Sequence, residues 1–313
     1  SAYSTDEIFK TAARLLEEKV TIIITAFKEP KVEEAIKSIL HQKISYPYEL
    51  IISAPDKETA VIAKRYAIKY KNVKHFADPG KGKSYALNLL FKKVKDEILI
   101  LTDGDVLLGE NSINEIAKQF REPSIGCVTG RVISANSKND KYGFWSHLLA
   151  DAGAHKIRKE LSEQDEFLEC SGYLFAFRNN GIIKKIPLDV AEDSIIPYYF
   201  WKKGYKVKYA DKAEVYVKNP IYFSDWLKQR KRTAKAHETL TKYAPDFPRM
   251  KSFRNEASRI LWALQYPRNF RELAWTLQLI FARAYMWASV FYDTRFKGKH
   301  YTDAWERVES TKI

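Results

Sequence analysis

Cysteine is scarce in this chain: Cys127 and Cys170 are the only two among its 313 residues. They do not form a pair with the spacing of a zinc site, which excludes a cysteine-built metal domain, and so few cysteines are typical of a reducing compartment. The N-terminus also lacks the apolar core of a secretion signal. These absences predict a cytoplasmic protein.

Acidic residues are in deficit too, with 39 Asp and Glu against 53 Lys and Arg, and the formal net charge is +14. Such an excess suits nucleic acid, an anionic membrane surface or a phosphorylated substrate, and equally a basic surface without a partner. Hydrophobic residues make up 45% of the chain and charged residues 29%, a normal globular composition that argues against intrinsic disorder.

Two phosphate-binding signatures are missing as well. Ala77 stands where a P-loop needs its first glycine, and the first strand–helix turn has no glycine of a dinucleotide-binding fold. Strands are nevertheless predicted at 20–25, 49–53 and 73–76, each followed by a helical pattern. This order predicts an α/β fold with a parallel, nucleotide-binding sheet and helices on its faces.

The segment 97–105 carries the strongest chemical signal. Its four apolar residues at 98–101 predict a strand buried on both faces, and the strand ends in Asp103-Gly104-Asp105. Two carboxylates at the carboxyl end of such a strand suit Mg²⁺ or Mn²⁺ held against a substrate phosphate. A surface turn rich in Asp and Gly is the alternative for this stretch taken alone.

The remaining pattern completes the fold class. Gly126 and Gly130 are expected at bulges or close approaches, and Gly172 at a close approach of the backbone to a ligand. Glu192 and Asp193 open a helix, where acids also occur simply because they complement the helix dipole. Further strands are predicted at 125–133, 167–177, 205–209 and 213–217 and helices at 1–19, 112–120 and 189–203, whereas 136–166 is polar and mixed.

The composition changes at residue 221. A basic run at 228–235 is followed by aromatic-rich helical sequence, and 273–292 is almost continuously apolar except for Gln278 and Arg283. Three alternatives stay open for 273–292: a packed helix, an interfacial membrane helix, or a membrane span, which Arg283 disfavours. We expect this region to hold the protein peripherally at the cytosolic face of a membrane.

Five of these pieces, in this order, resemble the inverting family 2 glycosyltransferases of GT-A fold, and most of all the catalytic domains of cellulose, chitin and hyaluronan synthases. The resemblance covers about 20–240. Its matches are the loop after the first strand, the Gly-Lys-x-x-Ala-Leu-Asn segment at 82–88, the Asp-x-Asp at 103–105, the Glu-Asp pair at 192–193 and the Gln-x-x-Arg segment at 229–233.

The resemblance implies a GT-A catalytic domain at 20–220, and an acceptor-side segment follows it. The apolar spacing predicts the N-terminal helix at 1–19, and the change of composition predicts a helical extension within 221–313. The resemblance also implies Asp193 as the general base, and a Mn²⁺ or Mg²⁺ ion on Asp105 and Asp103. The implied donor-binding residues are Ala26, Phe27, Glu29, Ser53, Lys83, Asp103 and Asp105, and those on the diphosphate and acceptor side are Gly172, Glu192, Gln229, Arg230, Arg232 and Thr233.

Two departures from the family pattern bear on specificity. Ser53 or Ala54 stands where the family often has an aspartate that reads uracil, which puts the choice of base in doubt. Thr233 replaces a tryptophan on which processive synthases rest the growing sugar chain. We therefore expect the addition of one or a few sugars, unless Trp226 or Tyr173 supplies the missing aromatic face.

The predicted function is transfer of a sugar from a nucleotide-diphosphate sugar, preferably a UDP-sugar, to a hydroxyl of a glycan or lipid-linked acceptor. An anionic membrane surface is the expected further partner, and nucleic acid is not. The alternatives are a nucleotidyltransferase, which would share the nucleotide-binding half and the metal, and a non-catalytic protein that binds nucleotide sugars or nucleic acid.

Overall fold

The computed structural model describes residues 18–248, 250, 254, 257, 259–296 and 311. Eight strands form a sheet in the order β3-β2-β1-β4-β7-β6-β8-β5. Six run in one direction, and β7 and β5 run in the other. The strands are β1 (Val20–Thr25), β2 (Tyr48–Ser53), β3 (Val73–Phe76), β4 (Ile98–Asp103), β5 (Val106–Leu108), β6 (Ile125–Ser134), β7 (Leu174–Arg178) and β8 (Lys206–Val217). The expectation of a mostly parallel sheet is confirmed.

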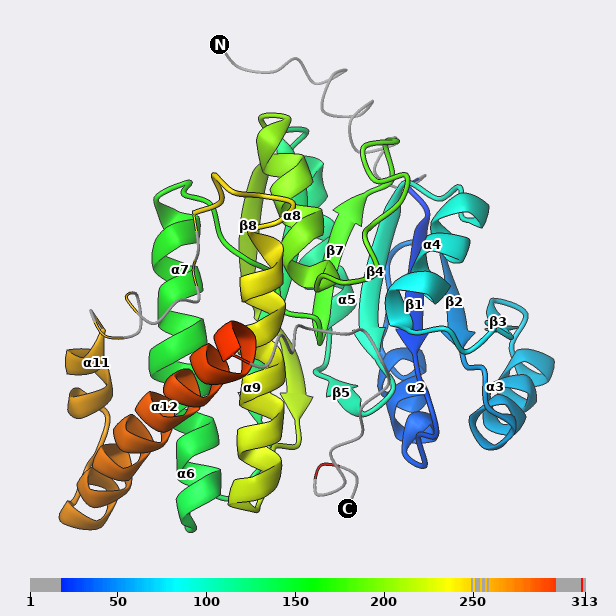
Figure 1. Cartoon of the computed structure of the whole chain (residues 1–313). Coiled ribbons are helices and arrows are strands. Elements are labelled where there is room, and N and C mark those ends of the chain that lie inside the picture. Colours follow the sequence, from blue (N-terminus) through cyan, green and yellow to red (C-terminus); the bar gives the residue numbers. More distant parts are fainter. Residues whose placement is uncertain are drawn as a thin grey trace.

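Helices cover both faces of this sheet (Figure 1). Alternate residues of β1 point to opposite sides, so Ile22 and Ile24 belong to one apolar cluster and Ile23 belongs to the other. The first cluster contains side chains of α2 (Val32–Leu40), α3 (Lys57–Lys69) and α5 (Ser112–Ala117); the second contains those of α4 (Lys83–Lys93) and α8 (Glu192–Lys202). Burial on both faces explains why β1 and β4 are continuous apolar runs.

A further group of helices packs beside the sheet. It comprises α6 (Lys141–Leu148), the π-helix η2 (Leu149–His155), α7 (Lys156–Glu163), α9 (Phe223–Leu240), α11 (Ile260–Gln265) and α12 (Phe270–Phe296). Figure 1 shows α12 crossing α9 and α6, and Trp145 of α6 packs there against Trp226 of α9 and donates a hydrogen bond to the Trp275 carbonyl oxygen over 2.7 Å. The segment 136–166, for which the sequence indicates no element, is thus largely helical.

Three sequence predictions need correction. The strand predicted at 167–177 is only β7 (Leu174–Arg178), and the two strands predicted at 205–209 and 213–217 are one continuous strand, β8. The helix predicted at 112–120 ends at Ala117 and continues as the 3₁₀ helix η1 (Lys118–Arg121). The β6–β8 register shifts next to Gly126 and Gly130, as expected for bulges.

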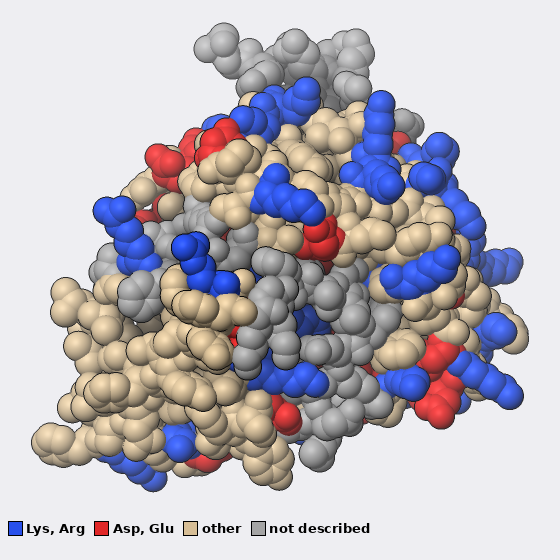
Figure 2. Space-filling model, in the orientation of Figure 1, with Lys and Arg blue, Asp and Glu red and all other residues tan. Residues whose placement is uncertain are grey.

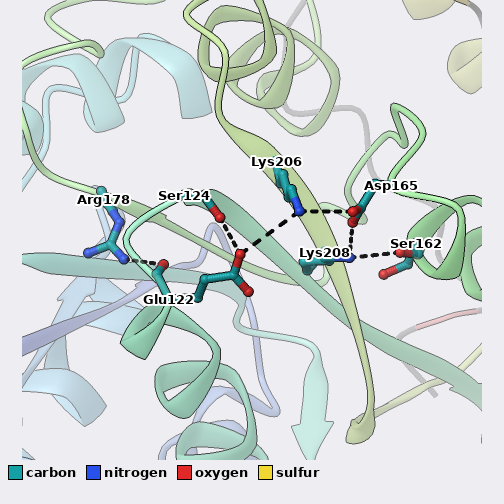
Figure 3. Close-up of polar contacts among 7 residues, drawn as sticks. All are labelled: Glu122, Ser124, Ser162, Asp165, Arg178, Lys206 and Lys208. Atoms are coloured by element: carbon teal, nitrogen blue, oxygen red, sulfur yellow. Dashed lines mark hydrogen bonds and ion pairs between the residues drawn. The ribbon is translucent and has the colours of Figure 1, made fainter. Parts of the chain in front are cut away.

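A polar cluster fastens the end of α7 to the start of β8 (Figure 3). The Lys206 ammonium lies 2.8 Å from the Asp165 carboxylate, which the Lys208 ammonium also contacts. Lys208 in addition donates to the Ser162 carbonyl oxygen over 2.9 Å. The cluster therefore positions α7 relative to the sheet.

The termini bear on two further expectations. Residues 1–17 of the predicted N-terminal helix lie outside the described residues. The predicted apolar helix at 273–292 is α12, which contacts α9, α6 and α11. Within the described ranges, no helix combines the length and apolar character that a membrane crossing requires.

Candidate functional site

A cavity of about 750 Å³ opens at the carboxyl ends of β1 and β4 and is bounded on its far side by α9 and α12. Of the fourteen residues that the resemblance assigns to the site, all but Ser53 line it. They are Ala26, Phe27, Glu29, Lys83, Asp103, Asp105, Gly172, Glu192, Asp193, Gln229, Arg230, Arg232 and Thr233. Segments more than 200 residues apart in the sequence therefore meet at one cavity.

Gly104 fixes the approach of the two aspartates to the loop after β1. Its N–H donates to the Thr25 carbonyl oxygen over 2.9 Å. A Cβ at this position would lie 2.7 Å from the Cβ of Ala26, which is closer than two carbon atoms can pack. Glycine is thus needed at 104 because the Asp103–Asp105 turn lies directly against the β1 loop.

Lys83, the first residue of α4, joins the two acidic segments of the site. Its ammonium lies 2.7 Å from Asp103 Oδ1 and 2.6 Å from Glu192 Oε1, and its side chain is 15% exposed. Burial alone would lower the pKa of Lys83, but the charges of Asp103 and Glu192 outweigh it and hold the pKa well above its ordinary value. Lys83 is therefore a permanent positive charge between the end of β4 and the start of α8.

Asp193 is held by the backbone that precedes β7. The Gly172 N–H donates to Asp193 Oδ2 over 2.9 Å, and the Cys170 N–H donates to the Asp193 carbonyl oxygen over 3.0 Å. The close approach expected at Gly172 is thus one to this carboxylate. The contact fixes the orientation of the Asp193 carboxylate at the cavity wall.

The acceptor-side residues Gln229 to Thr233 all lie on α9. The Thr233 hydroxyl donates to the Gln229 carbonyl oxygen over 3.1 Å, a bond within the helix. Trp226 is 2% exposed among other aromatics and does not line the cavity, whereas Tyr173 does. Burial raises the pKa of Tyr173 to about 12, and the Asp105 charge adds to this, so its hydroxyl is protonated near neutral pH.

Sequence reasoning missed part of the lining. Trp287 of α12 and the buried Arg158 of α7 both line the cavity. Arg158 donates to the carbonyl oxygens of Glu169 and Cys170, over 2.9 Å and 3.1 Å. Trp287 and Arg158 lie outside the recognised sequence motifs, so the sequence carried no signal that would place them at the cavity.

Ser53 is placed differently from expectation. It ends β2, but its hydroxyl donates to Asp78 Oδ2 over 2.8 Å, and neither residue lines the cavity. Both are buried, and the other Asp78 oxygen accepts from the Gly80 N–H over 2.9 Å. The carboxylate of Asp78, which follows the end of the neighbouring strand β3, thus lies beside Ser53.

The basic run at 228–235 is largely engaged within the protein. Arg230 and Arg232 line the cavity. Lys231 and Lys235 instead contact Asp293 of α12, with ammonium–carboxylate distances of 2.6 Å and 3.2 Å. These contacts dock α12 on α9 and reduce the part of the run available to a membrane surface.

The donor set at the cavity suits a hard divalent cation that also binds substrate. Asp103 and Asp105 would supply the oxygen ligands of such an ion, although Lys83 engages one oxygen of Asp103. Among the described residues, no group of three or more His, Cys, Asp or Glu side chains is arranged to hold a metal. Two carboxylates completed by substrate phosphates are a usual magnesium or manganese arrangement.

The sequence profile described as "Glycosyltransferase like family 2" matches residues 18–236, well over half of the chain. The chain belongs to this family. The match covers β1 through most of α9 and therefore includes every candidate residue described above. Between the alternatives left open by the sequence, membership favours a glycosyltransferase over a nucleotidyltransferase or a nucleic-acid-binding protein.

Individual relatives agree with the family. This family 2 glycosyltransferase is 23% identical over 240 residues to hyaluronan synthase of Streptococcus pyogenes, covering 70% of the chain and 57% of that protein. It is 23% identical over 233 residues to poly-beta-1,6-N-acetyl-D-glucosamine synthase of Staphylococcus aureus, covering 71% and 56%. The chain thus spans a little over half the length of these relatives.

A solved structure shows the same fold. The mannosyltransferase PcManGT from Pyrobaculum calidifontis, in complex with GDP-Man and Mn²⁺, aligns with a TM-score of 0.51 at 18% identity, over 93% of this chain and 88% of that one. The GT-A fold expected from the sequence is confirmed. The helical C-terminal part, represented by α9, α11 and α12, is confirmed with it.

Proposed function

We propose that this family 2 glycosyltransferase transfers a sugar, with inversion, from a UDP-sugar to a hydroxyl of a glycan or lipid-linked acceptor, and that it depends on a divalent metal. One observation carries the proposal. The Asp103–Asp105 turn, Lys83 and the Glu192–Asp193 pair converge on one cavity that α9 closes with Gln229 and Arg232.

The chain's own residues divide the reaction between two sides of the cavity. Asp193, oriented by the Gly172 N–H, accepts the proton of the acceptor hydroxyl as its oxygen bonds to the anomeric carbon. The bond from that carbon to the diphosphate oxygen breaks, and the nucleoside diphosphate leaves with the electron pair. A single displacement of this kind inverts the anomeric centre.

Positive charge stabilises the leaving group. Lys83 reaches the diphosphate as a point charge from the β4 side, and Gln229 and Arg232 do so from α9. A Mn²⁺ or Mg²⁺ ion held by Asp105 and Asp103 would neutralise further charge on the diphosphate. The paired arrangement of carboxylates and cations therefore fits a donor that carries two phosphates.

The proposal is tested by calorimetry with UDP and GDP, each with Mn²⁺ and with EDTA, followed by turnover assays with UDP-sugars. We expect UDP to bind with Mn²⁺ and not with EDTA, and Asp105→Ala to weaken the metal-dependent binding. Equal binding in EDTA would exclude the metal role. Tighter binding of GDP than of UDP would show that the donor carries guanine rather than uracil, and it would not affect the proposed transfer mechanism.

Thr233 supports the addition of one or a few sugars. Threonine offers little apolar area on which a sugar face can rest, and Trp226 is buried away from the cavity. Tyr173 remains at the cavity as the aromatic that could compensate. Mass spectrometry of early products tests this: long polymer together with unreacted acceptor would show a processive enzyme.

The outer face of α12 supports attachment to the cytosolic face of a membrane. Figure 2 shows the surface over α12 and α11 as largely free of charged side chains. Six of the large side chains exposed along α12 are Phe270 (91% exposed), Leu277 (44%), Phe281 (75%), Tyr285 (58%), Phe291 (62%) and Phe296 (70%). An apolar helix face of this kind fits the interface of a bilayer.

Liposome flotation tests this attachment. Phe281→Ser should weaken binding to anionic liposomes about ten- to a hundredfold, because a buried phenyl group contributes roughly 1.5–3 kcal/mol. The matched control is Ile68→Ser on α3, which removes a side chain that is 88% exposed at another place on the surface. Absence of the wild-type protein from both anionic and neutral liposomes would exclude the attachment.

A further inference from the structure

The cavity continues beyond the charged site along the η2, α11 and α12 helices, and this part has a different chemistry. Most of the side chains that line it are aliphatic, among them Leu149, Ala152, Ala263, Leu279 and Ile280, and Ile157 of the adjoining α7 lines the cavity as well. A Cβ built on Gly153 of η2 would meet no atom within 4 Å, which shows open space beside the helix. We call this part the aliphatic arm.

Carboxylates are confined to the other part of the cavity. Those among the described lining residues are Glu29, Asp103, Asp105, Glu192 and Asp193, and all lie at or just after the carboxyl ends of β1 and β4 or in α8. A glycan in the aliphatic arm would place hydroxyl groups against hydrocarbon, where an unpaired hydroxyl is costly. A hydrocarbon chain has no such cost and gains by leaving water.

Two arginines line the arm region. Arg283 lies in the middle of α12, between Ile280 and Ala284 on the cavity wall, and Arg259 directly precedes α11. The guanidinium group binds phosphate through paired, charge-assisted hydrogen bonds. Neither arginine belongs to the motifs assigned to the donor diphosphate.

We propose that the acceptor is a phosphate-bearing lipid, whose hydrocarbon chain occupies the aliphatic arm, whose phosphate binds Arg283 and Arg259, and whose hydroxyl-bearing head reaches Asp193. This inference rests on the proposed function and narrows its acceptor to one class. It also gives Arg283 a role in an otherwise apolar stretch of sequence.

The test is calorimetric titration of the full chain with decyl phosphate, methyl phosphate and decyl maltoside, each below its micelle concentration. Decyl phosphate should bind at one site and at least about 100-fold more tightly than methyl phosphate, because each buried methylene contributes roughly a fourfold gain. It should also bind more tightly than decyl maltoside, which has the same chain and no charge.

Two variants locate the site. Arg283→Gln should weaken decyl phosphate binding about ten- to a hundredfold, since a hydrogen bond to a charged group is lost. The matched control is Arg295→Gln, which removes an exposed arginine from the end of the same helix and should change nothing. Gly153→Leu should fill the arm and weaken decyl phosphate binding, and leucine favours a helix more than glycine does, so this variant should fold.

Titration of every variant with UDP and Mn²⁺ separates this inference from the proposed function. Normal UDP binding with equal affinity for decyl and methyl phosphate would overturn the lipid acceptor alone. Unchanged decyl phosphate binding in Arg283→Gln would overturn the placement of the phosphate. Absence of UDP binding in the wild type would count against the proposed function instead, whatever the lipid result.

Discussion

Two lysine–carboxylate clusters lie at opposite strand ends of the sheet, and they differ in which group is shared. At the carboxyl end of β4, the Lys83 ammonium forms ion pairs with two carboxylates, those of Asp103 and Glu192. At the start of β8, which runs in the same direction, Asp165 accepts from two lysines, Lys206 and Lys208. The first cluster has an excess of negative charge, whereas in the second cluster Glu122, 3.9 Å from the Lys206 ammonium, balances the second lysine (Figure 3).

Burial differs as much as stoichiometry. The side chains of Lys83 and Glu192 are 15% and 7% exposed, whereas Asp165 is 46% exposed. Removing charges from water is costly, and exposed ion pairs contribute little to stability. We infer that the Lys83 cluster is kept for the reaction, and that the Asp165 cluster serves only to hold α7 on β8.

The largest expected effect is on the general base beside the Lys83 cluster. Asp193→Asn keeps the shape of the side chain and removes its basicity, so transfer should fall by about 10² to 10⁴, while UDP binding stays near wild type. Steady-state kinetics and calorimetry measure the two quantities. Asp165→Asn is the matched control and should leave transfer unchanged.

A wild-type rate in Asp193→Asn would assign the base to another residue. Glu192 would then be the first candidate, because it is adjacent in the sequence and its carboxylate also lines the cavity.

The next effect concerns the lysine itself. Lys83→Met removes the ammonium group from both carboxylates, and we expect transfer to fall about 10²-fold or more and stability to fall by roughly 1–3 kcal/mol. Lys206→Met makes the same change in the exposed cluster and should leave transfer unchanged. Equal kinetic effects in the two variants would contradict the division of roles between the clusters.

The raised pKa of Lys83 also predicts that its charge does not change with pH near neutrality. A group with a raised folded-state pKa contributes stability below its unfolded pKa, about 10.4 for lysine, and loses it only as pH rises further. Lys83 therefore stays charged between pH 6 and 9. A change of activity in that range has to come from another group.

How far the sequence predicts these clusters depends on distance along the chain. The runs at β1 and β4 identify strands whose ends meet at one edge, which is enough to place Asp103 and Asp105. The contact of Lys83 with Glu192 joins residues far apart in the sequence. Only the family resemblance, which orders the motifs, brings these residues together before the fold is known.

The errors in the strand predictions also arise from contacts between residues that are far apart in the sequence. Residues 167–173 have strand-like composition, but side chains rather than the backbone of a neighbouring strand bind several of their backbone groups. Arg158 binds the carbonyl oxygens of Glu169 and Cys170, and the Ser171 N–H donates to the Thr129 hydroxyl. Helix α6 did carry a local signal, because Asp140 caps it by accepting from the Gly143 N–H over 2.9 Å.

A third cluster sharpens the comparison, because Asp293 also accepts from two lysines but is buried. Hydrogen bonds from Lys231 and Lys235 lower the pKa of Asp293 to about 2. Asp293→Asn should therefore lower the free energy of unfolding by about 1–2 kcal/mol at pH 7, measured by urea unfolding. A loss no greater than that of Asp165→Asn would show that burial does not decide the value of these pairs.

The smallest effect should come from Asp165→Asn. Hydrogen bonds from Lys206 and Lys208 lower the pKa of Asp165 to about 2, so its contribution is present above the unfolded pKa near 4 and is lost as pH falls towards 2. The urea midpoints of wild type and variant should differ slightly at pH 6, differ less at pH 3, and converge only when the pH falls to about 2. In 1 M salt, where screening acts over about 3 Å, this difference should shrink more than that of Asp293→Asn. A difference between wild type and Asp165→Asn that persists undiminished at pH 2 or in 1 M salt would show that Asp165 acts through its shape and backbone position rather than its charge.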